Sequence, residues 1–338
     1  MHLGKLPVAL GLVLVAAAAP ATSEEIKFGI GIPEGDYPEY NALVRFKDYV
    51  EFKTDGEITV RLFPNNQLGG EREMLEQVQQ GSLELTFPAD GAMAGFYPPM
   101  QVWSIPYLFE SAPVAWKVIN GPFANEMRAD ILDKTGMRAL AFSENGFRSF
   151  TNNVRPIVDP EDLAGLKIRT MESPVFMELV NSLGATATPI SGAEVLMSLR
   201  QGVVDGQENP PAVVYGGGLG EVQKYYTLNE HVFGLHVVIA DDTWFQSLSP
   251  GHQRVIQDAA QLMAWTENLE KTEGDWVFSE KLEEELGMEV HVSTPEEKTA
   301  FKELTQEPVL AFIRSNVGDA LVDDLLSAVD AAEADLYE

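Results

Sequence analysis

The chain has 338 residues, of which 52 are acidic and 23 are basic, giving a formal net charge of −29, and it contains no cysteine. So acidic a protein repels phosphate backbones and anionic lipids, which makes nucleic acid and membrane surfaces poor partners. The acids are scattered along predicted helices and are not clustered. This favours a solvated surface suited to saline surroundings over the alternative of a cation receptor.

The first 23 residues have the pattern of a secretory signal. A basic start with Lys5 precedes an apolar run over 6–19, and small residues follow around Ala19 and Ala21. A membrane anchor is the alternative, but a spanning helix needs roughly 20 apolar residues and this run is shorter. We therefore expect 1–23 to be a signal peptide that is removed on export.

The next part of the chain alternates between strand and helix patterns, which predicts an α/β fold. Strands are predicted over 26–30, 58–63, 83–87, 137–142 and 146–152, and helices around 43–50 and over 71–80, 113–118 and 123–134. The mature chain of about 315 residues is large for one core and suggests roughly two domains. No Ser/Gly-rich linker divides it, so we expect the domains to be interwoven.

Two polar motifs follow, each at the end of a predicted strand. A strand over 165–169 delivers Arg169, whose planar fork of donors suits a carboxylate. A short strand over 203–204 and an Asp-Gly turn lead to Asn209. Because ligands of open α/β sheets sit outside the carboxyl ends of strands, we expect these side chains to face a ligand.

The last third of the chain predicts elements that connect the domains. A strand over 231–240 is expected to cross back to the first domain, and a helix from Pro250 to about 286 would span on the order of 50 Å. His231 and His236 are five residues apart, on opposite faces of a strand, so a metal pair is not expected. Another strand over 289–292 and two final helices should close the second domain.

Motifs along nearly the whole mature chain resemble the DctP family, the periplasmic solute receptors of tripartite ATP-independent periplasmic (TRAP) transporters. The residues that carry this resemblance are Phe63-Pro64-Asn65-Asn66-Gln67-Leu68-Gly69-Gly70-Glu71, Ile105-Pro106-Tyr107-Leu108-Phe109, Gly146-Phe147-Arg148, Gly165-Leu166-Lys167-Ile168-Arg169, Val203-Val204-Asp205-Gly206-Gln207-Glu208-Asn209-Pro210 and Leu248-Ser249-Pro250. They occur in the family's order. The resemblance implies a periplasmic receptor that binds a small organic acid and delivers it to TRAP membrane subunits.

The family's fold is a type II binding protein, with two α/β domains around a ligand cleft and one long helix across both. On this pattern we expect domain I to comprise 24–145 and 235–274, and domain II to comprise 146–234 and 275–338. A monomer without cofactor or metal is expected.

The resemblance also implies roles for three residues: Arg169 would pair with the carboxylate, Arg148 would reinforce it, and Asn209 would hydrogen-bond. Loop position suggests further contacts from domain I at Gln67, Glu71, Asp90 and Tyr37. Gly192 departs from the family, because several relatives carry an aromatic residue there against which the ligand packs. The pocket is therefore expected to be roomier or differently filled.

Two other function classes remain open from the residues alone. A secreted lyase or hydrolase acting on an organic acid is the first, since 52 acids provide many chance carboxylate pairs, although no Gly-x-Ser-x-Gly, His-Glu-x-x-His or phosphate-loop motif is present. A structural or adaptor protein without a ligand is the second. Among receptor ligands, dicarboxylates, sugar acids, keto acids and sulfonates remain open.

Overall fold

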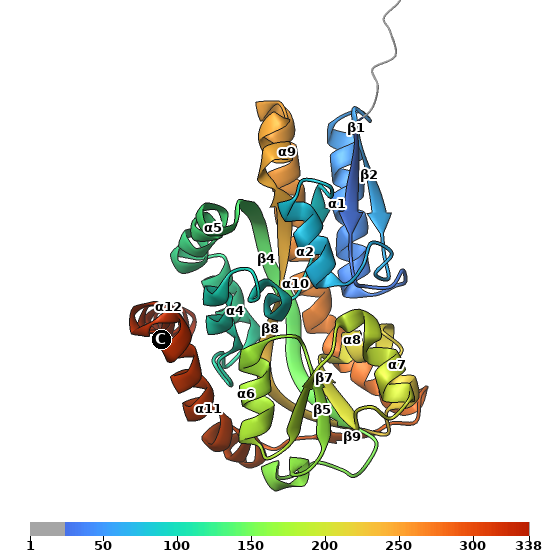
Figure 1. Cartoon of the computed structure of the whole chain (residues 1–338), viewed down its shortest axis with the longest axis vertical. Coiled ribbons are helices and arrows are strands. Elements are labelled where there is room, and N and C mark those ends of the chain that lie inside the picture. Colours follow the sequence, from blue (N-terminus) through green and yellow to red (C-terminus); the bar gives the residue numbers. More distant parts are fainter. Residues whose placement is uncertain (1–23, 338) are drawn as a thin grey trace, which may run out of the picture.

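The computed structural model describes residues 24–337 and has one mixed sheet running through the molecule (Figure 1). The strands follow the order β2-β1-β3-β8-β4-β7-β5-β6, and β9 pairs with β8. The expected α/β architecture, with two lobes and a long helix, is confirmed. The predicted signal peptide lies outside the described residues. Within the described part, no helix is both long and apolar enough to cross a membrane.

The first lobe is built around three parallel strands, two of which, β1 and β2, are labelled in the upper part of Figure 1. In β1 (Glu24–Gly29) the side chains of Ile26 and Phe28 are fully buried, and β1 pairs with β2 (Ile58–Phe63) and β3 (Leu85–Thr86). The helices of this lobe are α1 (Pro38–Lys53), α2 (Glu71–Gln79), α3 (Asp90–Met93), η1 (Pro98–Ser104), α4 (Ala112–Ile119) and α5 (Pro122–Thr135).

The second lobe contains the other end of the sheet. Its strands are β5 (Lys167–Thr170), β6 (Thr186–Pro189), β7 (Gly206–Asn209) and β9 (Glu289–Val292). Its helices are η2 (Pro160–Leu163), α6 (Pro174–Ser182), η3 (Gly192–Glu194), α7 (Val195–Arg200), α8 (Pro211–Gly216), η4 (Leu219–Val222) and α11 (Pro295–Val317).

Two long antiparallel strands join the lobes. β4 (Met137–Asn152) and β8 (Tyr225–Asp241) pair along their whole length, and β8 also pairs with β3 of the first lobe while β4 pairs with β7 of the second. The short helix α9 (Asp242–Ser247) follows β8. The expected crossing strand near 231–240 is thus part of β8, and β4 and β8 together connect the two lobes.

The two strands predicted over 137–142 and 146–152 are one strand, so the predicted break between them is wrong. The polar run between them is buried against the long helix: Ser143 Oγ donates to Glu267 Oε2, and the Glu144 amide donates to Asn268 Oδ1 at 2.8 Å. Gly146, at φ 113°, allows a bulge that keeps the strand paired. The polar residues between 142 and 146 therefore resemble a turn in the sequence although they continue the strand.

The strand predicted over 203–204 is also misplaced, because β7 starts at Gly206 and consists of the polar run that follows. All four of its residues are buried between β4 and β5. A polar strand is stable in this position because its side chains pair with polar side chains of β4: Gln207 donates to Thr151, and Glu208 accepts from Arg148. No hydrophobic pattern in the sequence indicates such pairing.

The long helix α10 (Pro250–Glu284) has 35 residues and packs against α1, β4 and α8, hence against both lobes. Ser249 caps its start by accepting from the His252 amide at 3.1 Å. Ile256 and Met263 join the core of the first lobe, while Leu282 joins that of the second. Buried apolar residues along α10 thus tie it to both halves.

The last helix, α12 (Asp319–Tyr337), lies against α4 of the first lobe. Tyr337 Oη and Ser111 Oγ are 2.6 Å apart, and Lys117 forms an ion pair with Asp335. The expectation that both final helices close the second domain therefore suits α11, which packs on α6, and does not suit α12.

Candidate functional site

A cavity of about 220 Å³ lies between the lobes, and segments far apart in the chain contribute to it. Its polar lining consists of Tyr37, Glu39, Asn65, Asn66, Glu71, Asn145, Arg148, Arg169, Asn209 and His236. The lobes come close beside it: a Cβ built on Gly70 would lie 2.8 Å from Ser191 Oγ. The site is therefore assembled only by the approach of both lobes.

Arg169 projects from β5, which is held between β6 and β7. Its Nε donates to the carbonyl of Ile190 at 2.8 Å, and it forms no ion pair with any described residue. The residue is 4% exposed. Burial lowers the pKa of its guanidinium to about 10, while the charges of Glu208 and Glu71 oppose this shift. Arg169 is therefore a buried cation at neutral pH, oriented by one backbone bond.

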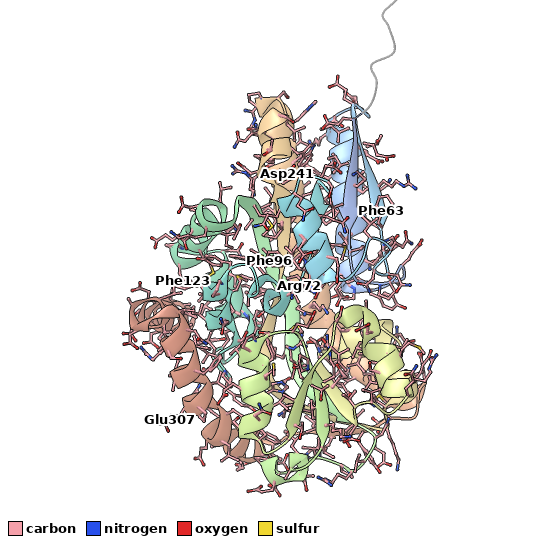
Figure 2. All side chains as sticks on the ribbon, in the orientation of Figure 1. Phe63, Arg72, Phe96, Phe123, Asp241 and Glu307 are labelled. Atoms are coloured by element: carbon pink, nitrogen blue, oxygen red, sulfur yellow. The ribbon has the colours of Figure 1, made fainter. Side chains whose placement is uncertain are left out.

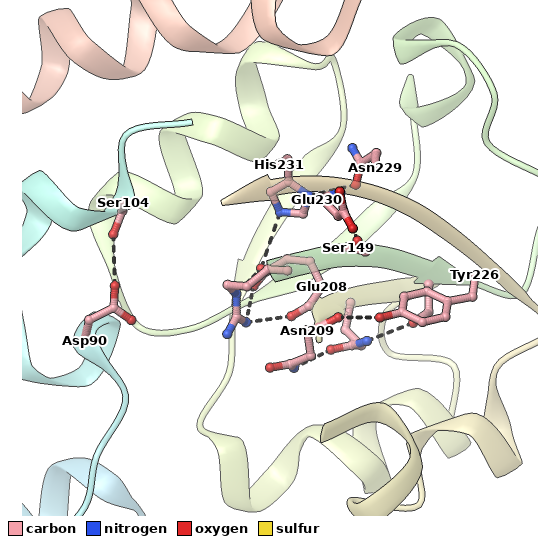
Figure 3. Close-up of polar contacts among 12 residues, drawn as sticks. Asp90, Ser104, Ser149, Glu208, Asn209, Tyr226, Asn229, Glu230 and His231 are labelled. Carbon is pink, nitrogen blue, oxygen red and sulfur yellow. Dashed lines mark hydrogen bonds and ion pairs between the residues drawn. The ribbon is translucent and has the colours of Figure 1, made fainter. Parts of the chain in front are cut away.

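Arg148 projects from β4 and already has an acidic partner, Glu208, which is labelled in Figure 3. Its Nε lies 2.5 Å from Glu208 Oε2 and its Nη2 lies 2.8 Å from Glu208 Oε1, with both side chains buried. Nη2 also donates to the Glu208 carbonyl at 2.6 Å. Burial alone would raise the pKa of the Glu208 carboxyl, but Arg148 and His231 outweigh it and lower that pKa to about 2. The Arg148–Glu208 pair is therefore neutral overall.

Asn209 lies beside the arginines at the end of β7 and lines the same cavity. Its Nδ2 donates to Gln207 Oε1 at 2.5 Å, and Gln207 in turn donates to Thr151 Oγ1 at 3.0 Å. The Tyr226 hydroxyl donates to the Asn209 carbonyl at 2.9 Å. These hydrogen bonds fix the amide in one orientation; Asn209 and Tyr226 are labelled in Figure 3.

The residues expected from the first lobe fall into two groups. Tyr37 and Glu71 line the cavity, and Glu71 is held by the Ala89 amide, which donates to Oε1 at 2.9 Å. Asp90 is buried outside the lining, where burial raises the pKa of its carboxyl to about 6. Gln67 is exposed and also lies outside the lining.

Sequence reasoning missed several lining residues. Asn65 and Asn66 immediately precede Gln67 and have φ angles of 55° and 56°, a left-handed conformation that asparagine tolerates. Their position in the same Asn-Asn-Gln run was the available signal. Asn145 lies at the bulge of β4, and His236 lies on β8 with Nδ1 2.7 Å from Glu267 Oε1. Neither could be found locally, because both strands had to be paired first.

A second cavity of about 140 Å³ adjoins the first and shares Glu71, Arg169, Met171 and Gly192 with it. Arg72 and Phe96, labelled in Figure 2, are part of its wall. A Cβ built on Gly192 would meet nothing within 4 Å. The missing side chain at 192 therefore leaves space beside Arg169.

Within residues 24–337, no group of three His, Cys, Asp or Glu side chains is placed to hold a metal ion. His231 stacks on Phe150 with ring centroids 4.2 Å apart, and its Nδ1 lies 3.0 Å from Asn229 Oδ1.

Two lobes joined by crossing strands, with a buried arginine facing the cavity between them, define the class of two-lobed solute-binding proteins.

Comparison with known proteins agrees with this class. The model of the DctP family, described as bacterial extracellular solute-binding protein, family 7, matches residues 31–316. The chain belongs to this family, which confirms the resemblance found in the sequence. Its structural neighbours are TRAP periplasmic solute-binding proteins.

Three similar proteins illustrate the relationship. The 2,3-diketo-L-gulonate-binding periplasmic protein YiaO of Escherichia coli is 32% identical, over 75% of this chain and 78% of that protein. The sugar acid binding protein DctPAm of Advenella mimigardefordensis, in complex with galactonate, has a TM-score of 0.88 at 31% identity, covering 92% of this chain and 99% of that one. A TRAP solute-binding protein of Shewanella oneidensis, with bound succinate, has a TM-score of 0.85 at 26% identity, covering 92% and 99%.

Proposed function

We propose that this protein is a periplasmic receptor that binds a small organic acid between its lobes and delivers it to the membrane subunits of a TRAP transporter. The observation that carries the proposal is Arg169, a buried guanidinium that lines the cavity and has one backbone bond and no ion pair among the described residues. A carboxylate removed from water needs both charge and hydrogen bonds, and an arginine fork supplies them. The named ligands of the relatives, diketogulonate, galactonate and succinate, are all carboxylates.

The proposed binding residues follow from their positions. Arg169 pairs with the carboxylate, and Asn209 hydrogen-bonds it from the neighbouring strand. Arg148 contributes less to the ligand's charge because Glu208 neutralises it, so its role is to support the site's shape and polarity. Tyr37 and Glu71 contact the ligand from the first lobe. Asp90 and Gln67 lie outside the cavity lining and are therefore not proposed as ligand-binding residues.

The proposed domains are those expected from the sequence, with one change. Residues 24–145 with 235–274 form one moving unit, and 146–234 with 275–318 form the other, while α12 stays with the first unit because it packs on α4. The protein works as a monomer, in which β4 and β8 act as the hinge.

A thermal-shift screen against a panel of organic acids tests the receptor function, because a ligand that binds only the folded state raises its melting temperature. At least one carboxylate should raise it in a dose-dependent way, and calorimetric titration should give a saturating site. Stabilisation by no carboxylate on the panel would contradict the proposal. The enzyme alternative is separated by mass spectrometry: a receptor returns its bound acid unchanged, whereas a lyase or hydrolase returns product.

A further inference from the structure

The charged residues around the cavity can balance the charge of one ligand carboxylate only. Arg148 is paired with Glu208, and Glu39 is paired with Lys271, which is itself fully buried and outside the lining. Arg169 is then the one described lining cation without an acidic partner. A second ligand carboxylate would be desolvated without a counter-ion, which is strongly unfavourable in a closed site.

The remaining wall is rich in acceptors. Asn145 Oδ1 is buried, on a residue that is 3% exposed, and it has no hydrogen-bond partner among the described residues. Among the described residues Glu71 has no ion-pair partner; it lines the cavity and accepts a hydrogen bond from the Ala89 amide. His236 directs Nδ1 to Glu267, which leaves its second ring nitrogen for a ligand. Acceptors in such a wall are satisfied by donors, and an ionised carboxylate has none.

A hydroxyl group meets this requirement, because it donates one hydrogen bond and accepts others. We infer that the ligand is a polyhydroxylated monocarboxylate, whose carboxylate faces Arg169 and whose hydroxyls face Asn145 and Glu71, and that dicarboxylates are disfavoured. This inference rests on the proposed receptor function and narrows its substrate class. Asn145, which is held on the bulge of β4 and carries no other assigned role, becomes a residue that determines specificity.

Calorimetric titration with ligands of equal chain length tests the class. The probes are a set of stereoisomeric aldonates, the aldarates of the same stereochemistry, adipate, hexanoate and the neutral polyol sorbitol. At least one aldonate should bind about tenfold or more tightly than its aldarate, than adipate and than hexanoate. Adipate or an aldarate that binds more tightly than every aldonate would overturn the inference and leave the receptor function standing, whereas binding by no acid would contradict both.

Variants of Asn145 test its assigned contact. Asn145→Leu keeps the size of the side chain and removes the acceptor, so it should weaken the best aldonate about tenfold and leave hexanoate binding unchanged. Asn145→Asp retains an acceptor at the same position and should recover most of the lost affinity for the aldonate. Gln67→Ala, in an exposed residue outside the lining, is the matched control. Equal losses for the aldonate and hexanoate would mean that Asn145 acts only on the fold, and the assigned contact would be wrong.

Discussion

Arg148 and Glu208 form a buried two-point ion pair between β4 and β7, with nitrogen–oxygen distances of 2.5 and 2.8 Å. The two residues are 60 positions apart in the chain. Their pairing changes what is expected of Arg148, because a neutralised arginine stabilises the lobe more than it attracts a ligand.

Removing one member of this pair should destabilise the protein. Arg148→Ala leaves Glu208 charged and buried, and the loss of a buried partner costs about 3–5 kcal/mol of unfolding free energy. Glu208→Gln should also destabilise, since it leaves Arg148 without its counter-ion. Chemical denaturation measures both, with Arg61→Ala, at an exposed ion pair, as a control that should lose at most about 1 kcal/mol. A stability of Arg148→Ala equal to that of the control would contradict the structural role.

Arg169 variants should separate affinity from stability. Arg169→Ala leaves the ligand carboxylate unpaired, and truncating one partner of a buried charge pair costs about 2–5 kcal/mol, so affinity should fall on the order of 30-fold to several thousand-fold. Arg169→Lys should also weaken binding, because lysine offers a point charge in place of a fork. Calorimetry with melting curves measures both. A folded Arg169→Ala protein that binds as tightly as the parent would remove the central claim.

Filling the space at Gly192 should change which acids fit. A Cβ there meets nothing within 4 Å, so Gly192→Phe should fold normally and narrow the passage between the two cavities. The best ligand of the parent should lose about tenfold in affinity or more, while Gly192→Ala should bind like the parent. Competition titrations with acids of different bulk measure this. Unchanged affinity for every acid would show that ligands do not use the space beside Gly192.

Stability should fall as the pH rises above the acidic range. Burial, aided by the charge of Asp275, raises the pKa of the Glu144 carboxyl to about 8, and burial also raises that of Asp275 to about 7 against the opposing charge of Lys271. Because these folded-state pKa values lie above the unfolded ones, the native state binds more protons between about pH 4.5 and pH 8, and stability decreases across that window. The melting temperature should be higher near pH 5 than near pH 8.

The same pH series on two variants identifies the groups responsible. Glu144→Gln keeps an acceptor for Trp116 Nε1, which donates to the parent carboxylate at 2.6 Å, and removes the titrating group. It should flatten the decline, and Asp275→Asn should do the same. Glu126→Gln, at an exposed acid on α5, is the control and should keep the parent's slope. An unchanged slope in both buried variants would assign the pH dependence elsewhere.

Ligand binding should make the protein more compact. The lobes are joined by β4 and β8 and come close at Gly70 and Ser191, so closure of this hinge brings the cavity walls together. Small-angle scattering should give a smaller radius of gyration at ligand saturation. Gly70→Leu places a side chain where Ser191 Oγ lies and should reduce both the compaction and the affinity. An unchanged radius for the saturated parent would contradict hinge closure.

Local patterns in the sequence were enough for much of the fold. Strand β2 has the predicted bounds, because the apolar residues Ile58, Val60 and Leu62 alternate along it with the polar residues at 59 and 61. The start of α10 follows from Ser249 and Pro250, a cap and a first-turn proline. Arg169 and Asn209 were found because residues at strand ends are brought to one edge by any open α/β sheet.

Tertiary structure alone decided the partners of the polar residues. Ser143 and Glu144 are hydrogen-bonded to Glu267 and Asn268 of α10, each 124 positions further along the chain. Nothing in the sequence near 143–144 indicates these partners. For the same reason the sequence predicts a turn at 205–206 and a polar run after it in place of strand β7, and it gives no signal that Asn145 and His236 line the cavity. Hydrophobic periodicity records which side of an element is buried, whereas hydrogen-bond and charge pairing between distant segments exists only once the sheet is assembled.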